Sequence, residues 1–144
     1  MIYTEMTNIA MRCAYNAHLG QLDYNNVPYV FHPYHLAEQM DDEISCTVAL
    51  LHDVVEDTQV TIEELKKQFP KEVTDAVALL THDSAVDYFD YVKALKHNPI
   101  ARKVKLADLA HNSDQSRCVG SDLSLEELNA WKEKYAKAKA ILID

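Results

Sequence analysis

Glycine and proline are scarce in this chain. Its 144 residues include only two glycines and four prolines. A sheet-rich fold needs many tight turns, and tight turns use these two residues, so their scarcity favours helices joined by short loops. Two isolated glycines also leave no glycine-rich loop that could cradle phosphates with backbone amides. The P-loop and the dinucleotide-binding fingerprint are therefore excluded.

Basic residues, cysteines and long apolar runs are also few. Acidic residues outnumber basic ones by 23 to 14, for a formal net charge of −9, which argues against nucleic acid or an anionic membrane as a partner. The three cysteines form no CxxC pair and are expected to be free thiols. No signal peptide and no membrane-spanning run is found. We expect a cytoplasmic protein, and its oligomeric state stays open.

Apolar residues recur at helical spacing along most of the chain, and no segment alternates with period two. Thr61 and Ser124 each precede a Glu by three residues, which is typical of a capping box, and Pro70 and Pro99 are expected to open two further helices. We therefore predict an all-α fold of about seven or eight helices in one compact domain spanning residues 1–144. The expected helices cover residues 4–18, 35–41, 45–56, 61–69, 70–81, 88–96, 99–116 and 124–141.

Two polar residues interrupt the most apolar segment, ALLHDVVED. The helix expected over residues 45–56 is apolar on nearly every face, which indicates burial, yet it carries His52 and Asp53. A buried carboxylate without a partner is costly, so Asp53 must be paired, coordinated or protonated. A metal ion would bind both side chains. The alternative is a hydrogen-bonded core histidine beside a structural ion pair, for instance with Lys105.

Two further residues share the character of His52 and Asp53. Asp108 is an acid within the apolar helical stretch VKLADLAHN, and His32 precedes Pro33. The backbone of the residue before a proline is held extended, which would fix the direction of the His32 imidazole. Two imidazoles and two carboxylates suit manganese, iron or zinc rather than calcium. Such a set leaves coordination positions open for water and substrate, as a catalytic site requires.

Two more acids lie one helical turn after the doublet. Glu56 follows His52 by four residues and Asp57 follows Asp53 by four, so each is expected beside a ligand on the same face. Carboxylates there would orient a water or accept its proton, which indicates metal-assisted hydrolysis. A frayed, solvated helix end is the alternative. The other histidines are expected on the surface or at helix ends, or, for His111, beside the site: His18, His35, His82, His97 and His111.

The motifs of the chain resemble the HD-domain phosphohydrolases, whose metal pattern is His, then His-Asp, then Asp. Over residues 5–140 the chain is similar to the hydrolase domain of RelA/SpoT proteins and their small single-domain relatives. GQ…VPYVFHP, ALLHDVVEDT, FPKEV, an LT element and VKLADLAHN follow in that order. The resemblance implies that Glu56 and Asp57 position and activate the attacking water. It implies one Mn²⁺, with Fe or Zn as alternatives, bound by His32, His52, Asp53 and Asp108.

The same resemblance implies a nucleotide substrate. RelA/SpoT-type hydrolases remove pyrophosphate from the ribose 3′ position of ppGpp and pppGpp. Asn112 matches a family residue close to the substrate ribose and the metal, and Tyr135 matches a tyrosine that lines the nucleotide pocket. The synthetase half of the large RelA/SpoT enzymes has no counterpart here, so the resemblance implies a stand-alone hydrolase.

One site departs from the family pattern. After Gly-Gln, alarmone hydrolases usually carry Arg-Lys, which contacts the guanine base and the phosphates, but here Asp23 and Tyr24 stand in those places. An acid facing a polyphosphate is unfavourable unless it turns away, whereas Tyr24 can stack on a base. Two alternatives stay open: a phosphatase for another phosphorylated nucleotide or metabolite, and a non-catalytic nucleotide-sensing module. Four basic residues remain that could contact phosphate: Arg12, Lys103, Lys105 and Arg117. The alternative for each is a surface charge or a structural ion pair.

Overall fold

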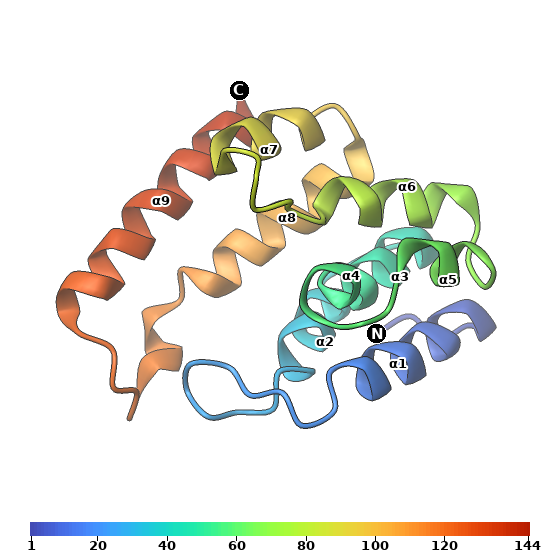
Figure 1. Cartoon of the computed structure of the whole chain (residues 1–144), viewed down its shortest axis with the longest axis horizontal. Helices are drawn as coiled ribbons and strands as arrows, with labels where there is room; N and C mark the ends of the chain where they lie inside the picture. Colours follow the sequence, from blue (N-terminus) through green and yellow to red (C-terminus); the bar gives the residue numbers. More distant parts are fainter.

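All regular secondary structure in the computed structural model, which describes residues 1–144, is helical (Figure 1). The elements are α1 (Glu5–Ala17), α2 (Phe31–Glu38), α3 (Glu43–Leu51), α4 (Val54–Asp57), α5 (Ile62–Lys66), α6 (Lys71–Leu80), α7 (Tyr88–Leu95), α8 (Pro99–Asn112), the 3-10 helix η1 (Gln115–Cys118) and α9 (Leu125–Ile143). A single isolated bridge pairs Leu22 with Pro28. No helix combines the length and the apolar character needed to cross a bilayer. The predicted all-α class is confirmed.

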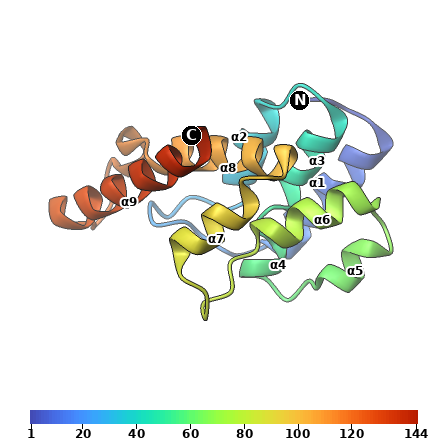
Figure 2. The same cartoon turned by 90° about the horizontal axis from the view of Figure 1, so that it is seen from above.

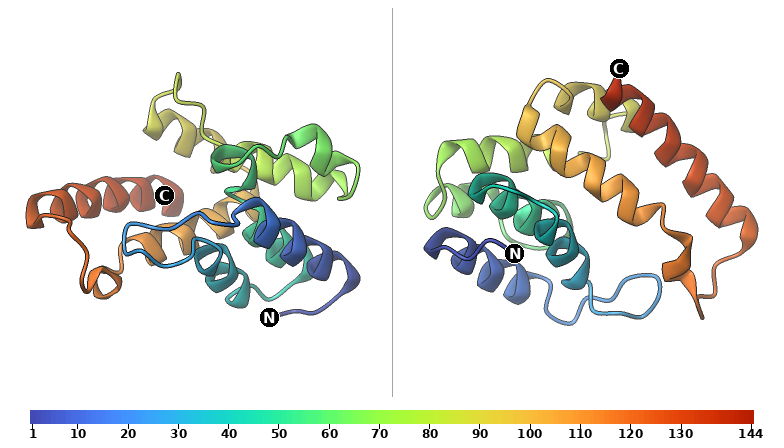
Figure 3. Two further views of the ribbon diagram at one scale, coloured as in Figure 1. Left: turned by 60° about the horizontal axis from the view of Figure 1, so that its bottom comes forward. Right: turned by 180° about the vertical axis from the view of Figure 1, so that it is seen from behind.

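Helix α3 lies at the centre of the molecule. Every residue from Ser45 to Leu51 is buried, and α1, α2, α6 and α8 pack around it (Figures 1 and 3). Its apolar side chains belong to a core of 25 buried residues drawn from helices along the whole chain. A helix that is apolar on every face needs neighbours on every side. This requirement brings α2 and α8, which carry His32 and Asp108, against the end of α3.

Helix α9 lies at one edge of the molecule. It packs against α7 and α8, and it stands apart from the body formed by α1 to α6 (Figure 2). Only Ala138 and Leu142 of its 19 residues are buried. The C-terminal half of α9 is therefore anchored in the core, while its N-terminal half borders the pockets described below.

The predicted helix starts are mostly correct. Thr61 accepts a hydrogen bond from the Glu64 amide at 3.2 Å, and Ser124 accepts one from the Glu127 amide at 3.1 Å. Pro99 is the first residue of α8, as predicted. Pro70 is the N-cap of α6 rather than its first helical residue, so that helix begins one residue later than predicted.

Two predicted boundaries are wrong. Helix α2 begins at Phe31 and ends at Glu38, instead of covering residues 35–41. Pro33 fits in its first turn because an amide there has no partner inside the helix, so His32 is helical rather than extended. Helix α8 ends at Asn112 instead of residue 116, and Asp114 caps the separate 3-10 helix through the Ser116 amide.

The helix predicted over residues 45–56 is broken at the His-Asp doublet. Helix α3 ends at Leu51 and α4 begins at Val54, so the eight expected helices become nine. The His52 Nδ1 lies 2.7 Å from the Ala49 carbonyl oxygen, which in a continuous helix would accept from the Asp53 amide. In such a helix the two side chains would point about 100° apart. At this turn their Nε2 and Oδ2 atoms lie 3.0 Å apart.

Candidate active site

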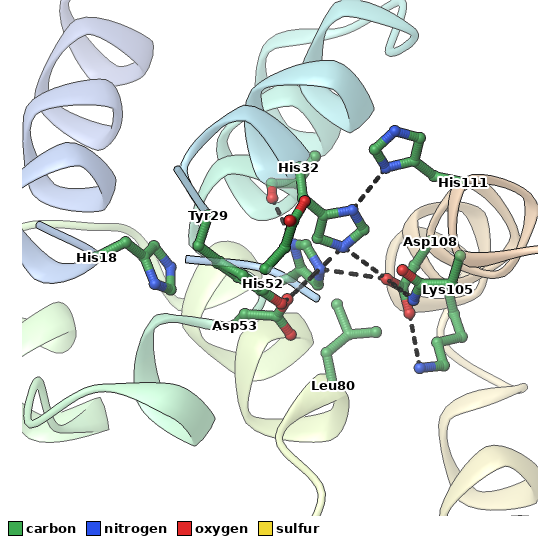
Figure 4. A network of polar contacts seen from close by, with 12 residues as sticks. His18, Tyr29, His32, His52, Asp53, Leu80, Lys105, Asp108 and His111 are labelled. Atoms are coloured by element: carbon green, nitrogen blue, oxygen red, sulfur yellow. Dashed lines mark hydrogen bonds and ion pairs between the residues drawn. The ribbon is translucent and has the colours of Figure 1, made fainter. Parts of the chain in front are cut away.

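Four side chains from three helical segments converge at the centre of the molecule (Figure 4). One ligand atom each from His32, His52, Asp53 and Asp108 lies within 4.8 Å of the other three. The closest pair is His32 Nε2 and Asp108 Oδ1 at 2.9 Å, and His52 Nε2 lies 3.6 Å from the same oxygen. The structure therefore brings together the four residues that the sequence singled out as metal ligands.

The hydrogen bonding of His52 leaves one nitrogen directed at this cluster. Its Nδ1–H donates to the Ala49 carbonyl oxygen at 2.7 Å, which leaves Nε2 as the nitrogen that a cation would coordinate. That Nε2 is buried and makes no hydrogen bond. A buried polar atom without a hydrogen bond is costly, and coordination of a cation removes this cost. The donor set therefore fits a divalent metal.

His111 orients the ring of His32 so that its Nε2, like that of His52, is directed at the cluster. The Nδ1 atoms of the two rings lie 2.7 Å apart and the rings are stacked. Burial and the nearby Arg117 lower the pKa of His111 to about 3, so that its ring stays neutral and accepts. The Nδ1–H of His32 then donates to it, which directs His32 Nε2 at the cluster.

Asp108 is held from several sides. Its Oδ2 accepts from the buried Lys105 at 2.8 Å, and its Oδ1 accepts from Asn112 Nδ2 at 3.0 Å. Burial alone would raise the pKa of Asp108, but Lys105 and the two imidazoles outweigh it and hold that pKa well below its usual value. Lys105 is thus a structural partner of a metal-site carboxylate, and Asn112 lies beside the cluster as expected.

Asp53 has a partner that sequence reasoning missed. The Tyr29 hydroxyl donates to Asp53 Oδ2 at 2.5 Å, across 24 residues of chain. Despite burial, the neighbouring His52 lowers the pKa of Asp53 to about 2. Tyr29 belongs to the VPYV segment before His32, which was expected to be a loop. No spacing rule connects a tyrosine in a loop with His52 and Asp53. The only feature of the sequence that pointed to Tyr29 was its position three residues before the expected metal ligand His32.

Glu56 and Asp57 lie next to the cluster on α4. Their carboxylate oxygens and one of Asp53 lie within 4.8 Å of one another. Glu56 is exposed at the pocket, where it accepts from the His82 backbone amide at 2.6 Å and partial desolvation raises its pKa. Asp57 is exposed as well, yet partial desolvation in the pocket and the charges of Asp53 and Glu56 raise its pKa to about 7. Asp57 is thus suited to accept a proton near neutral pH.

Two adjoining pockets open beside these residues. The first, here called the metal pocket, has a volume of about 200 Å³. The second, here called the aromatic pocket, has a volume of about 210 Å³ and includes Tyr24 and Trp131. Tyr29, Asn112 and Tyr135 line both pockets. The predicted substrate residues Asn112 and Tyr135 therefore lie between the two, and Tyr24 lines the aromatic pocket only.

The acid that departs from the family pattern is turned into its own loop. Asp23 Oδ1 accepts from the Asn25 and Val27 amides at 2.7 and 3.1 Å, and its Oδ2 lies 3.5 Å from Arg117. Lys103 pairs with Asp41 and Asp42 on the surface. Arg12 lies in a separate apolar groove lined by α1 and α2 residues. The cation that sequence reasoning missed is Lys134, which lines the metal pocket and lies 4.2 Å from the Tyr88 ring centroid.

The remaining histidines follow the predictions, and one of them is also buried. His35 and His97 are exposed, and His111 is a neighbour of the site. His18 was expected at a helix end or on the surface, and it is indeed the C-cap of α1. Its ring, however, is 2% exposed and lies 5.0 Å from the Tyr29 ring. His18 therefore matches the predicted helix-end role, and its ring is buried because the loop that carries Tyr29 folds over it.

Removal of the Tyr29 hydroxyl is expected to weaken the metal site. Hydrogen-bond partners of ligating carboxylates change metal affinity by about tenfold to a hundredfold. Tyr29→Phe should therefore raise the dissociation constant for Mn²⁺ by that factor while retaining the fold. Isothermal titration calorimetry on metal-free protein measures this, with Tyr15→Phe on the exposed face of α1 as the control. Equal affinity in Tyr29→Phe and wild type would contradict a supporting role.

Chelation is expected to lower the melting temperature. A ligand that binds only the folded chain at a hundred times its dissociation constant stabilises by about 2.7 kcal/mol, which corresponds to about 5–10 °C for a domain of this size. Differential scanning fluorimetry with and without EDTA, in Mn²⁺-loaded protein, measures the shift. An unchanged melting temperature would argue against a tightly bound ion.

The chain is similar in sequence to proteins of several organisms. It is 32% identical over 130 residues to guanosine-3′,5′-bis(diphosphate) 3′-pyrophosphohydrolase MESH1 of Xenopus tropicalis and equally to that of Homo sapiens; each match covers 80% of this chain and 73% of the relative. It is 33% identical over 116 residues to the bifunctional (p)ppGpp synthase/hydrolase SpoT of Escherichia coli, with 69% of this chain and 16% of that protein covered.

Family and fold comparisons agree with these relatives. Residues 10–114 match the model of a family described as HD domain. A solved structure of a metazoan ortholog of SpoT that hydrolyzes ppGpp superimposes with a TM-score of 0.77 at 22% identity, covering 99% of this chain and 94% of that one. That likeness extends the shared fold to α9. The chain therefore belongs to the HD-domain phosphohydrolase family, in the group that includes MESH1.

Proposed function

We propose that this chain hydrolyses guanosine 3′,5′-bis(diphosphate) to GDP and pyrophosphate. The observation that carries the proposal is the convergence of two imidazoles and two carboxylates within 4.8 Å, beside two more carboxylates in the same pocket. The relatives named as 3′-pyrophosphohydrolases support the choice of substrate. The open metal pocket, with carboxylates beyond the ligand set, favours an enzyme over a sensing module.

His32, His52, Asp53 and Asp108 would hold one divalent ion, for which we propose Mn²⁺. Such an ion supplies Lewis acidity for a phosphoryl oxygen and lowers the pKa of a water. Asn112 and Tyr135 would position the ribose between the two pockets, and Tyr24 would contact the base. The hydrogen bonds that Tyr29 and Lys105 donate to the two carboxylates, and the one that His111 accepts from His32, keep the ligand side chains in place before substrate arrives.

Glu56 and Asp57 would handle the proton. Hydrolysis adds water to the phosphorus attached to the ribose O3′, breaks the bond between that phosphorus and O3′, and returns a proton to O3′. Asp57, with its pKa raised to about 7, accepts the proton of the water. Glu56, fixed by the His82 amide, orients that water. Lys134 at the pocket wall would balance part of the pyrophosphate charge.

Incubation of purified protein with ppGpp and each of Mn²⁺, Fe²⁺ and Zn²⁺ tests the proposal. We expect GDP and pyrophosphate, with the highest turnover in Mn²⁺, measured by anion-exchange chromatography. A second candidate, a phosphatase for another 2′- or 3′-phosphorylated nucleotide, is favoured by the pairing of Asp23 with Arg117, which leaves the base end without a free cation. Release of phosphate from such a nucleotide and none of pyrophosphate from ppGpp would select it.

A further inference from the structure

The two pockets of the site are complementary in chemistry. The metal pocket is lined by three of the four ligand residues and by Glu56, Asp57 and Lys134, whereas the aromatic pocket is bordered by Tyr24, Trp131 and Tyr135 and reaches the fourth ligand, His32. Neither pocket alone reaches the about 300 Å³ at which small-molecule sites begin. Because the pockets share a wall, one ligand with a phosphorylated end and a flat apolar end would fill both.

The charged groups of the aromatic pocket are engaged with protein atoms. Asp23 accepts from two amides of its own loop and faces Arg117 at 3.5 Å. Arg117 donates through Nη1 to the His111 carbonyl oxygen at 2.9 Å. Asp114 accepts from the Ser116 amide at 3.0 Å and from its hydroxyl at 2.5 Å. The one guanidinium of the pocket is therefore already engaged, and both of the pocket's carboxylates are hydrogen-bonded to protein atoms.

Its aromatic side chains remain accessible. The rings of Tyr24 and Trp131 lie 4.9 Å apart at an interplanar angle of 56°. Tyr24 is 71% exposed and Trp131 is half-buried. The two residues come from the loop after α1 and from α9, so their contact joins segments more than a hundred residues apart in the chain. An exposed tyrosine beside tryptophan at a ligand pocket offers π faces to a flat ring.

We propose that Tyr24 and Trp131 form a platform on which the nucleotide base stacks, so that this chain binds the base end of its substrate by stacking rather than by charge. This inference rests on the proposed function, because the metal pocket must hold the phosphorylated end. It gives a physical meaning to Asp23 and Tyr24: the acid is bonded to amides of its own loop and paired with Arg117, while the aromatic ring of Tyr24 faces the ligand. Stacking accepts any base, and the larger face of a purine binds better than a pyrimidine.

Steady-state kinetics on the full chain with Mn²⁺ test the platform. Loss of a stacking side chain weakens binding by about tenfold to a hundredfold. We therefore expect Trp131→Leu and Tyr24→Ala each to raise KM for ppGpp by that factor and to change kcat little, because the reacting phosphorus lies in the other pocket. Tyr15→Ala, which removes an exposed tyrosine of α1, is the matched control and should leave KM unchanged.

Intrinsic fluorescence gives a readout independent of turnover, because Trp131 is the sole tryptophan. We expect GDP to quench it in a saturable way, UDP to bind more weakly, and inorganic pyrophosphate to leave it unchanged. Tyr24→Ala should raise the dissociation constant for GDP by about tenfold, whereas Tyr15→Ala should not. A change of fluorescence with pyrophosphate equal to that with GDP would overturn the platform, since pyrophosphate has no base.

The outcomes separate the platform from the proposed activity. If GDP quenches Trp131 and ppGpp is not hydrolysed, the platform stands and the proposed substrate fails. If ppGpp is hydrolysed but Trp131→Leu keeps the wild-type KM, the platform is wrong and the activity stands. A lower melting temperature of Trp131→Leu without any change in KM would show that the aromatic pair only fastens the loop to α9.

Discussion

Replacing Asp53 by asparagine is expected to remove bound metal and, with it, hydrolysis. The change keeps the size of the side chain but deletes the charge whose oxygen lies 3.0 Å from His52 Nε2 and 3.7 Å from His32 Nε2. Polarisation by a divalent ion is worth several kcal/mol in such reactions, and each 1.36 kcal/mol is tenfold in rate. Turnover of ppGpp should fall by about a thousandfold or more.

Metal content and turnover must be measured together in this variant. Inductively coupled plasma mass spectrometry gives ions per chain after dialysis, and Asp75→Asn, the same change at an exposed surface pair with Lys71, serves as the control. Stoichiometric metal in Asp53→Asn would contradict the ligand assignment. Metal loss with full activity would instead contradict metal-dependent hydrolysis.

Replacing Asp57 by asparagine is expected to lower turnover by about a hundredfold to ten-thousandfold, the range for loss of a positioned general base. Mn²⁺ content should remain that of wild type, since Asp57 lies outside the four-ligand set. This combination distinguishes Asp57 from Asp53. Normal turnover in Asp57→Asn would leave Glu56 as the proton acceptor.

The same substitution is expected to change how stability depends on pH. An aspartate has an ordinary pKa of 3.8, and in the folded chain the pKa of Asp57 is raised to about 7. Between these values the folded state holds a proton that the unfolded state releases, so the free energy of unfolding falls as pH rises through this window. Asp57→Asn lacks this titration and should lose less stability over the window.

Urea denaturation in EDTA from pH 4 to pH 8 measures this difference. EDTA is needed because a bound cation lowers the pKa of nearby carboxylates. Wild type and Asp57→Asn should have similar stability at the acid end, and the variant should be the more stable above pH 7. Parallel curves for the two proteins would show that Asp57 titrates normally in the folded state.

The fold was predictable wherever residues within a single segment determine the structure of that segment. Thr61, Ser124 and Pro99 mark helix starts through local backbone bonding, and the apolar faces of residues 45–51 predict a central helix. The break at His52 was not predictable, because a side-chain bond to the Ala49 carbonyl competes with the helical pattern. The apolar periodicity continues on both sides of the break and conceals it.

The ligand set was predictable for a different reason. An acid or an imidazole inside an apolar helix is costly to bury, so His52, Asp53 and Asp108 stand out without any knowledge of their partners. Tyr29 and His111 do not stand out, since their contacts with Asp53 and His32 cross 24 and 79 residues. The pairing of Asp23 with Arg117 is equally invisible in sequence and decides the chemistry of the aromatic pocket.

The spacing of the four converging side chains has a consequence for the order of folding. His32 and Asp108 are 76 residues apart, and α8 follows seven other α-helices along the chain. During synthesis, which proceeds from the N-terminus, the imidazoles and Asp53 emerge well before Asp108. Closing so long a loop is slow compared with forming single helices. Cation uptake during refolding would then report the docking of α8, one of the last steps in building the core.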